Sequence, residues 1–179
     1  MFNRPEDNLN NFKIEEGMTV ADFGAGIGAY SLPLAKRVGM SGKVYAIEVQ
    51  KDLLARLSQE AVRLKISNLE VIWGDVEKAG GSKIPERSLD LVLISNVLFQ
   101  SSAKYSILKE AKRILKPDGR LVIIDWEDSY GNLGPTATAI IKPAELEKIL
   151  GELGFKVLKK FSAGDHHYGL VSSLSLMPN

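Results

Sequence analysis

A glycine-rich stretch begins at Asp22 and places glycines at Gly24, Gly26 and Gly28. It follows a short apolar run, where a strand is expected to turn into a helix. Glycines there permit a sharp turn and a close approach to a ligand, and free N–H groups at a helix start favour an anionic group. The stretch predicts a nucleotide-type pocket. With Ala29 as its third small residue it also fits the dinucleotide fingerprint, so two classes stay open.

Three carboxylates fall at the ends of neighbouring apolar runs, at Asp22, Glu48 and Asp75. Glu48 lies about 20 residues beyond the glycine stretch, where a nucleotide-binding fold places a carboxylate for ribose hydroxyls. Each carboxylate alone could equally cap a turn. Three of them at the carboxyl ends of adjacent strands favour a binding site.

The elements that must position these residues follow from the period of the apolar pattern. Short runs rich in Val, Ile and aromatic residues predict strands covered on both faces, at residues 19–23, 43–49, 69–73, 89–95 and 120–126. Segments of helical period lie between them, at residues 53–64 and 107–115 among others. Pro117-Asp118-Gly119 predicts a turn before the fifth strand. The alternation indicates a parallel sheet.

The pattern changes after the fifth strand. Residues 127–142 are polar and include Gly131 and Gly134, so a loop is expected, and a helix should run from Pro143 to Leu153. The strand-like residues 155–161 and 167–176 are joined by a short turn and must pair antiparallel. The predicted fold is α/β: a doubly wound, seven-stranded, mostly parallel sheet with a C-terminal antiparallel hairpin.

Composition narrows the class of protein. The chain has 179 residues, which suit a single domain over residues 1–179 with residues 1–16 as a short N-terminal extension. The formal net charge of +1 gives no reason to expect a nucleic-acid or membrane partner. Without cysteine there can be no disulfide or thiolate metal site, and adjacent His166 and His167 point to opposite faces of a strand, so no metal is expected. The apolar runs are too short for a signal peptide or membrane span, so a cytoplasmic location is expected.

From about residue 17 to its end, the chain resembles the class I S-adenosylmethionine-dependent methyltransferases. The resemblance rests on Asp22-Phe23-Gly24-Ala25-Gly26-Ile27-Gly28, Glu48, Gly74-Asp75-Val76, Leu89-Asp90-Leu91-Val92, Leu115-Lys116-Pro117-Asp118-Gly119 and the closing hairpin. It implies a Rossmann-like methyltransferase fold and an enzyme that uses S-adenosyl-L-methionine as its cofactor.

The resemblance gives each cofactor-binding position a chemical role. Glu48 would accept hydrogen bonds from both ribose hydroxyls, and Val49 would offer an apolar wall to the adenine. Asp75 would accept from the adenine amino group while the Val76 N–H donates to a ring nitrogen. Asp22 would face the amino group of the methionine moiety, directly or through water. The expected cofactor-binding set is Asp22, Gly24, Gly26, Gly28, Glu48, Val49, Asp75, Val76 and Asn96.

The methyl acceptor is expected to be a small molecule, and the sequence does not identify it. Residues 123–127, Gly134-Pro135 and residues 167–170 resemble a small-molecule or quinone-type branch of the family. Asn96 follows the fourth strand, where the family's active-site loop begins, but residues 95–99 lack the Pro-Pro-aromatic sequence of DNA adenine methyltransferases. The absence of cysteine excludes cytosine C5 methylation and the cysteine-dependent arsenite branch. Glu127 and His167 are candidate general bases, and positioning without any base is the competing account, so no catalytic residue is assigned.

Two alternatives remain. Tyr105 and Lys109 match the Tyr-x-x-x-Lys pair of short-chain dehydrogenases, although they follow the fourth strand rather than the fifth. The chain could also be a methyltransferase-like module that binds cofactor without turnover, or a subunit of an assembly. A protein partner or a homodimer is left open.

Overall fold

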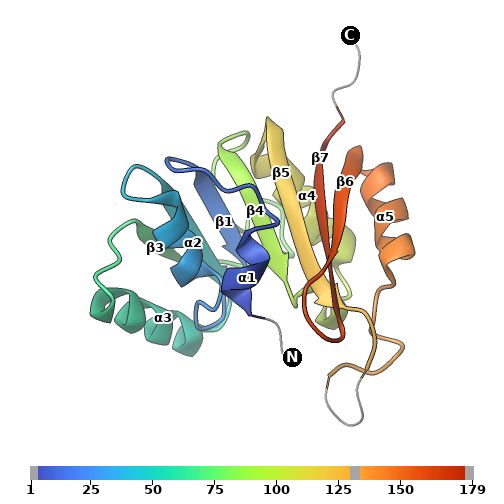
Figure 1. Ribbon diagram of the computed structural model, residues 1–179, viewed down its shortest axis with the longest axis horizontal. Helices are drawn as coiled ribbons and strands as arrows, with labels where there is room; N and C mark the ends of the chain where they lie inside the picture. Colours follow the sequence, from blue (N-terminus) through green and yellow to red (C-terminus); the bar gives the residue numbers. More distant parts are fainter. Residues whose placement is uncertain (1–3, 130–133, 176–179) are drawn as a thin grey trace.

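The computed structural model describes residues 4–129 and 134–175. Within them, seven strands form one sheet in the order β3-β2-β1-β4-β5-β7-β6 (Figure 1). The strands are β1 (Thr19–Phe23), β2 (Lys43–Glu48), β3 (Leu69–Trp73), β4 (Leu89–Ser95), β5 (Leu115–Trp126), β6 (Phe155–Ser162) and β7 (His167–Leu174). The helices are α1 (Pro5–Leu9), α2 (Ser31–Val38), α3 (Lys51–Arg63), the 3-10 turn η1 (Leu98–Gln100), α4 (Lys104–Ile114) and α5 (Pro143–Glu152).

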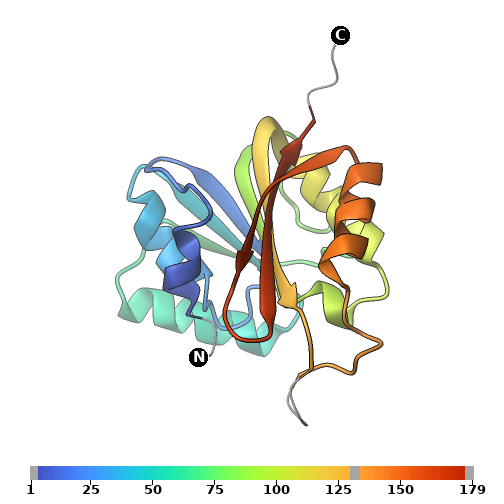
Figure 2. The ribbon, with the colours of Figure 1, turned by 45° about the vertical axis from the view of Figure 1, so that its right-hand side comes forward.

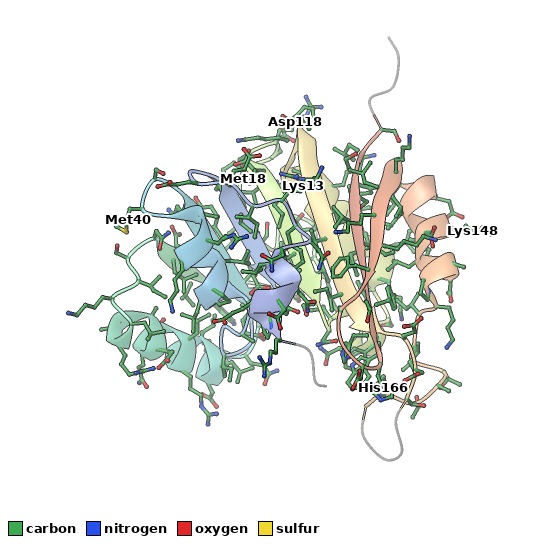
Figure 3. All side chains as sticks on the ribbon, viewed as in Figure 1. Lys13, Met18, Met40, Asp118, Lys148 and His166 are labelled. Atoms are coloured by element: carbon green, nitrogen blue, oxygen red, sulfur yellow. The ribbon has the colours of Figure 1, made fainter. Side chains whose placement is uncertain are left out.

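The sheet confirms the predicted fold. Strands β1 to β5 pair in parallel, and β7 lies antiparallel between β5 and β6. The strand order reverses between β1 and β4, and ligands of open α/β sheets bind outside the carboxyl ends of the strands at such a reversal. This carboxyl edge lies at the bottom of Figure 1. In Figure 3, the labelled His166 lies at this edge and Asp118 at the opposite one.

Helices cover both faces of the sheet (Figure 2). Successive side chains of a strand point to opposite faces, so the apolar runs can feed two cores. Val20 of β1 packs in the core under α1 and α2, whereas Ala21 and Phe23 pack in the core under α4 and α5. Asp22 shares the face of Val20, and this places its carboxylate beside the start of α2.

The fifth strand corrects one prediction. We expected Pro117-Asp118-Gly119 to form a turn and the strand to begin at residue 120, but β5 begins at Leu115. Leu115 pairs with Leu89, and the pairing then shifts so that Leu91 meets Arg120. Because Leu115 is fully buried at that position, residues 116–119 form an irregularity within the strand instead of a separate turn.

Smaller differences concern element ends. β2 ends at Glu48, one residue before the expected Val49, and β7 ends at Leu174. The predicted end of the last strand at Leu176, and Gly131 of the expected loop, lie outside the described residues. Residues 74–88 join β3 to β4 without any helix, so the segment that carries Asp75 packs on the domain as a loop.

The N-terminal residues hold structure that the sequence pattern did not predict. α1 is followed by Phe12, which is fully buried against the α2 side of the sheet. The side-chain amide of Asn8 donates to the hydroxyl of Tyr30 (2.9 Å) and to the carbonyl of Ala163 in the β6–β7 turn (3.2 Å). The description of residues 1–16 as an extension of a single domain stays a prediction.

Candidate functional site

The glycine loop follows β1 and requires the backbone freedom of glycine. Gly24, Gly26 and Gly28 have φ angles of 71°, 56° and 91°, in the left-handed region that L side chains rarely adopt. A Cβ on Gly24 would lie 2.5 Å from the Val97 side chain, and one on Gly28 would lie 2.3 Å from that of Leu57. The loop therefore lies close against both η1 and α3, at the carboxyl edge.

Asp22 lies at the end of β1 with only 2% of its surface exposed. The Ser31 hydroxyl at the start of α2 donates to its carboxylate at 2.6 Å. Burial raises the pKa of Asp22 from 3.8 to about 7, since the hydrogen bonds from Ser31 only partly offset desolvation and the nearby Glu48 charge adds to it. A buried carboxyl of this kind gains most from a cationic partner.

Glu48 connects the glycine loop to the start of α3. One carboxylate oxygen accepts from the backbone N–H groups of Val49 (2.8 Å) and Gln50 (2.9 Å), and the other accepts from Gly26 (3.1 Å). The side chain is 7% exposed. Each carboxylate oxygen has further acceptor capacity, so the same group can hold the loop and receive hydroxyl donors from a ligand.

Asp75 and Val76 lie in the turn after β3. The Asp75 carboxylate accepts from the Glu77 N–H (3.1 Å) and pairs with the Lys78 ammonium (3.0 Å). The hydrogen bond from Lys78 holds the pKa of Asp75 below its ordinary value, so the group is an ionised acceptor near neutral pH. The turn thus presents one carboxylate and neighbouring backbone amides at the carboxyl edge.

A cavity of about 370 Å³ lies between the ends of β1, β2 and β3. Five predicted residues line it: Gly24, Glu48, Val49, Asp75 and Val76. It is also lined by Ile47, Gln50, Gly74, Glu77, Val97, Gln100 and Ser101. Four predicted residues are not among the lining residues: Asp22, Gly26, Gly28 and Asn96. Gly26 nevertheless donates to Glu48, and Asp22 lies two residues before Gly24.

The sequence motifs did not predict Val97, Gln100 and Ser101 as residues of this cavity. They belong to η1 and its ends, and no spacing in the sequence marks them. The Ser101 hydroxyl donates to the Glu77 carboxylate at 2.6 Å, which joins the η1 side of the cavity to the Asp75 turn. The only available signal would have been the polar pair Gln100 and Ser101, five and six residues after the end of β4.

A larger cavity of about 810 Å³ lies on another side of the glycine loop, between α1, α2 and α3. It touches Gly28 and contains Ile27, Leu32 and Leu64 among its apolar walls. None of the three predicted carboxylates lines it. The smaller cavity is therefore the candidate site, because carboxylate acceptors and an apolar wall occur together there.

Asn96 and His167 meet beside the cavity. Asn96 adopts a positive φ of 55°, and its side-chain oxygen lies 3.1 Å from the His167 Nε2. The His167 Nδ1 lies 3.2 Å from the carbonyl of Asp165. Burial, and then the charge of His166, lower the pKa of His167, so the ring is neutral at pH 7. Because the Asp165 carbonyl can only accept, its contact with Nδ1 favours the tautomer with the proton on Nδ1. Nε2 then accepts, and the Asn96 amide must turn its N–H₂ toward it.

Two other candidates take different positions. The exposed Glu127 uses its backbone N–H and carbonyl to bind His166 and Lys142. The hydroxyl of Tyr105, on α4, donates to the carboxylate of Glu152 at the end of α5, and Tyr105 does not line the cavity. The structure therefore gives no support to the dehydrogenase pair.

In residues 4–129 and 134–175, no three His, Cys, Asp or Glu side chains gather in a way that would hold a metal ion. None of the helices described has the length and apolar character that crossing a bilayer requires.

The seven-stranded sheet with its antiparallel closing hairpin and a glycine loop facing two strand-end carboxylates defines a nucleotide-binding α/β class. A model of the methyltransferase domain family matches residues 14–160, and the chain belongs to this family. The family, the fold and S-adenosylmethionine as the family's cofactor agree with the expectations from the sequence.

Individual relatives cover different shares of the chain. The demethylmenaquinone methyltransferase of Oceanobacillus iheyensis is 28% identical over 120 residues, which are 67% of this chain and 49% of that protein. The arsenite methyltransferase of Aquipseudomonas alcaligenes is 32% identical over 114 residues, which are 62% and 33% of the two chains. The chain therefore spans half or less of these relatives. The crystal structure of a SAM dependent methyltransferase from Aquifex aeolicus matches with a TM-score of 0.87 and 31% identity, over 97% of this chain and 90% of that one.

Proposed function

We propose that this protein is an S-adenosylmethionine-dependent methyltransferase that acts on a small-molecule acceptor. The observation that carries the proposal is the convergence of Gly24, Glu48 and Asp75 on one cavity of about 370 Å³ at the strand-order reversal. The names of the curated relatives support a small acceptor, since they are a demethylmenaquinone and an arsenite methyltransferase. The cytoplasmic location stays a prediction.

The residues present fit the cofactor. Glu48 would bind the ribose hydroxyls, Val49, which is 55% exposed, would cover the adenine, and Asp75 with the Val76 N–H would bind the base edge. The buried carboxyl of Asp22 would attract the cationic amino group of the methionine moiety. When bound, the cofactor supplies a sulfonium methyl group that is open to in-line attack.

The chain's part in the reaction is then to orient the acceptor and exclude water. Trp126 packs on His167 with ring centroids 4.3 Å apart and faces Phe99 edge-on at 6.4 Å. These three rings come from β5, β7 and η1 and meet next to Asn96. They favour a planar, apolar acceptor of the quinone type, whereas a chain without cysteine offers no thiolate for arsenite.

Replacing Glu48 with alanine is expected to weaken binding of S-adenosylhomocysteine by about 1–3 kcal/mol, because charge-assisted partners lose their acceptor. Isothermal titration measures the effect. The matched control is Glu60→Ala, which removes a partly exposed carboxylate of α3 paired with Arg63 and should leave the affinity unchanged. Since Glu48 also holds three backbone N–H groups, the melting temperature of each variant is measured alongside.

An unchanged affinity in Glu48→Ala would remove the ribose assignment. Preferential binding of a nicotinamide dinucleotide by the wild type would favour the dehydrogenase alternative instead. Cofactor binding without any methylated product, in mass spectrometry of a broad acceptor screen, would favour the non-catalytic module.

Replacing His167 with glutamine tests the choice between a base and a positioning role. The Asn96 contact on Nε2 favours positioning, so we expect turnover to fall by less than about tenfold, whereas loss of a general base costs about 100-fold or more. Burial lowers the pKa of His167, so a base would produce a rate that rises with pH below about 6.5, and the variant would lose that limb. Turnover rates of the wild type and the variant, measured from pH 5 to 8, distinguish the two roles. A variant that loses the rising limb of the pH profile and is about 100-fold slower would contradict the positioning role.

A further inference from the structure

A carboxylate on α4 is buried beneath the loop that follows β3. Glu110 is 2% exposed and accepts from the backbone N–H groups of Gly80 (2.9 Å) and Ser82 (3.2 Å) and from the Ser82 hydroxyl (2.5 Å). The Arg113 guanidinium, one turn further along α4, donates to it at 2.9 Å and 2.7 Å. Five hydrogen bonds therefore converge on one buried side chain.

The same pair of residues holds the next part of the loop. Arg113 also donates to the carbonyl of Ile84 at 2.8 Å, and the Ser82 hydroxyl accepts from the Ile84 N–H at 3.3 Å. Ser82 is fully buried and Ile84 nearly so. Residues 74–88 contain no helix, so this polar cluster holds the segment together with Val76 and Ile84, which pack in the apolar core.

Burial would raise the pKa of Glu110, but the hydrogen bonds from Arg113, Ser82 and the backbone outweigh it and lower the pKa to about 2. The carboxylate is therefore ionised throughout the neutral range. A neutral side chain of the same shape could not accept from all five donors, so the anchoring depends on the charge.

Residues 80–82 lie in close contact with the backbone of the Asp75 turn. A Cβ on Gly81, between the two residues that donate to Glu110, would lie 1.8 Å from the carbonyl oxygen of Asp75. A Cβ on Gly74 would lie 2.5 Å from the carbonyl oxygen of Gly81. The two backbone segments are thus in direct contact, and a shift of residues 80–82 must move Asp75.

We propose that Glu110 is a positioning residue for base recognition: through Ser82 and Gly81 it fixes where Asp75 and Val76 meet the adenine edge of the cofactor. The inference rests on the proposed function, because it takes the cavity beside Asp75 as the adenine site. It adds a specificity-determining residue that lies on α4 and does not line the cavity.

The test compares S-adenosylhomocysteine with S-inosylhomocysteine, whose base carries a carbonyl in place of the amino group and a protonated ring nitrogen. In the inosine compound, the Asp75 carboxylate would face a carbonyl in place of the amino donor, and the Val76 N–H would face the protonated ring nitrogen. The wild type should therefore bind it at least about tenfold more weakly. Glu110→Gln should reduce the ratio of the two dissociation constants to about threefold or less. At least one donor of residues 80–82 then loses its acceptor, so this segment no longer fixes the position of Asp75. Isothermal titration gives both dissociation constants, and circular dichroism reports folding.

Ser82→Ala is the second variant, because it removes only one hydroxyl from the cluster and should lower the ratio less than Glu110→Gln does. Glu147→Gln is the matched control, since it breaks an ion pair with Lys160 (2.7 Å) between α5 and β6 and should keep the wild-type ratio. A ratio that stays at the wild-type value in both Glu110→Gln and Ser82→Ala would overturn the inference and leave the proposed function intact. A wild-type protein that bound neither compound, or both equally, would overturn the adenine assignment itself.

Discussion

Asp22→Asn is expected to stabilise the free protein at about pH 8 and to weaken its binding of S-adenosylhomocysteine. The folded-state pKa of Asp22 is about 7, against an ordinary value near 3.8. Between these values the folded protein holds a proton that the unfolded chain has released, so stability is full below about pH 4 and is lost as pH rises to about 7. Asparagine keeps the shape of the side chain and the acceptor for Ser31, but it does not ionise, so the variant does not lose stability as the pH rises. The gain at pH 8 should be about 2–4 kcal/mol, since three pKa units set the upper limit.

Binding should change in the opposite direction. An ammonium group needs the ionised form of Asp22, so cofactor affinity of the wild type should rise with pH up to about 7 and then level off. In Asp22→Asn the affinity should be about tenfold or more lower at pH 8, with that rise absent. Denaturant unfolding and isothermal titration at pH 5, 6, 7 and 8 measure both effects.

The control for Asp22 is Asp90→Asn in β4. The Asp90 carboxylate pairs with Lys116 (2.6 Å) and accepts from the Thr19 N–H (2.8 Å), at the opposite edge of the sheet. Its replacement should lose stability and leave binding unchanged. If Asp22→Asn bound the cofactor as the wild type does, the carboxylate would have only a structural role beside Ser31.

Gly24→Ala should weaken cofactor binding far more than Gly26→Ala. Both residues have positive φ angles, so each alanine costs about 1 kcal/mol of backbone strain. At Gly26 the new methyl group meets nothing within 4 Å, whereas at Gly24 it lies 2.5 Å from the stiff side chain of Val97. Relieving that overlap moves a wall of the cavity, and overpacking adds about 1–3 kcal/mol to the loss of stability.

We expect the affinity of Gly24→Ala for S-adenosylhomocysteine to be at least about tenfold below that of Gly26→Ala, which corresponds to about 1.4 kcal/mol. Thermal unfolding should rank the two variants in the same order. Equal affinities in the two variants would show that the ligand does not lie between the glycine loop and Val97.

Much of the fold could be predicted because its parallel strands are buried on both faces and read as short apolar runs. β5 departed from prediction because Pro117, Asp118 and Gly119 have turn chemistry, while the burial of Leu115 beside Leu89 extends the strand past them. The short α1 was not predicted, since five residues give no helical period even with Pro5 at its start.

Residues of the candidate site divide in the same way. Gly24, Glu48 and Asp75 were identified because their distance from a strand end is local information, and all three line the cavity. η1 could not be placed from sequence, because its position depends on the buried Asp125 carboxylate, which accepts from the Phe99 N–H at 3.2 Å. The contact between Asn96 and His167 spans 71 residues and depends on the pairing of Trp126 with His167, which only the folded sheet defines.

We expect the helix-free connection between β3 and β4 to give the two ends of the proposed cofactor cavity different local stabilities. The Gly24 end follows a central strand covered by α2 and by buried apolar side chains, so its amides should exchange with solvent only in large openings. The Asp75 end has no covering helix and is held by the polar cluster around Glu110 and by Val76 and Ile84 in the core, so we expect it to open more readily. If the proposed site is right, release of the cofactor would begin at the adenine end and would not require the protein to unfold.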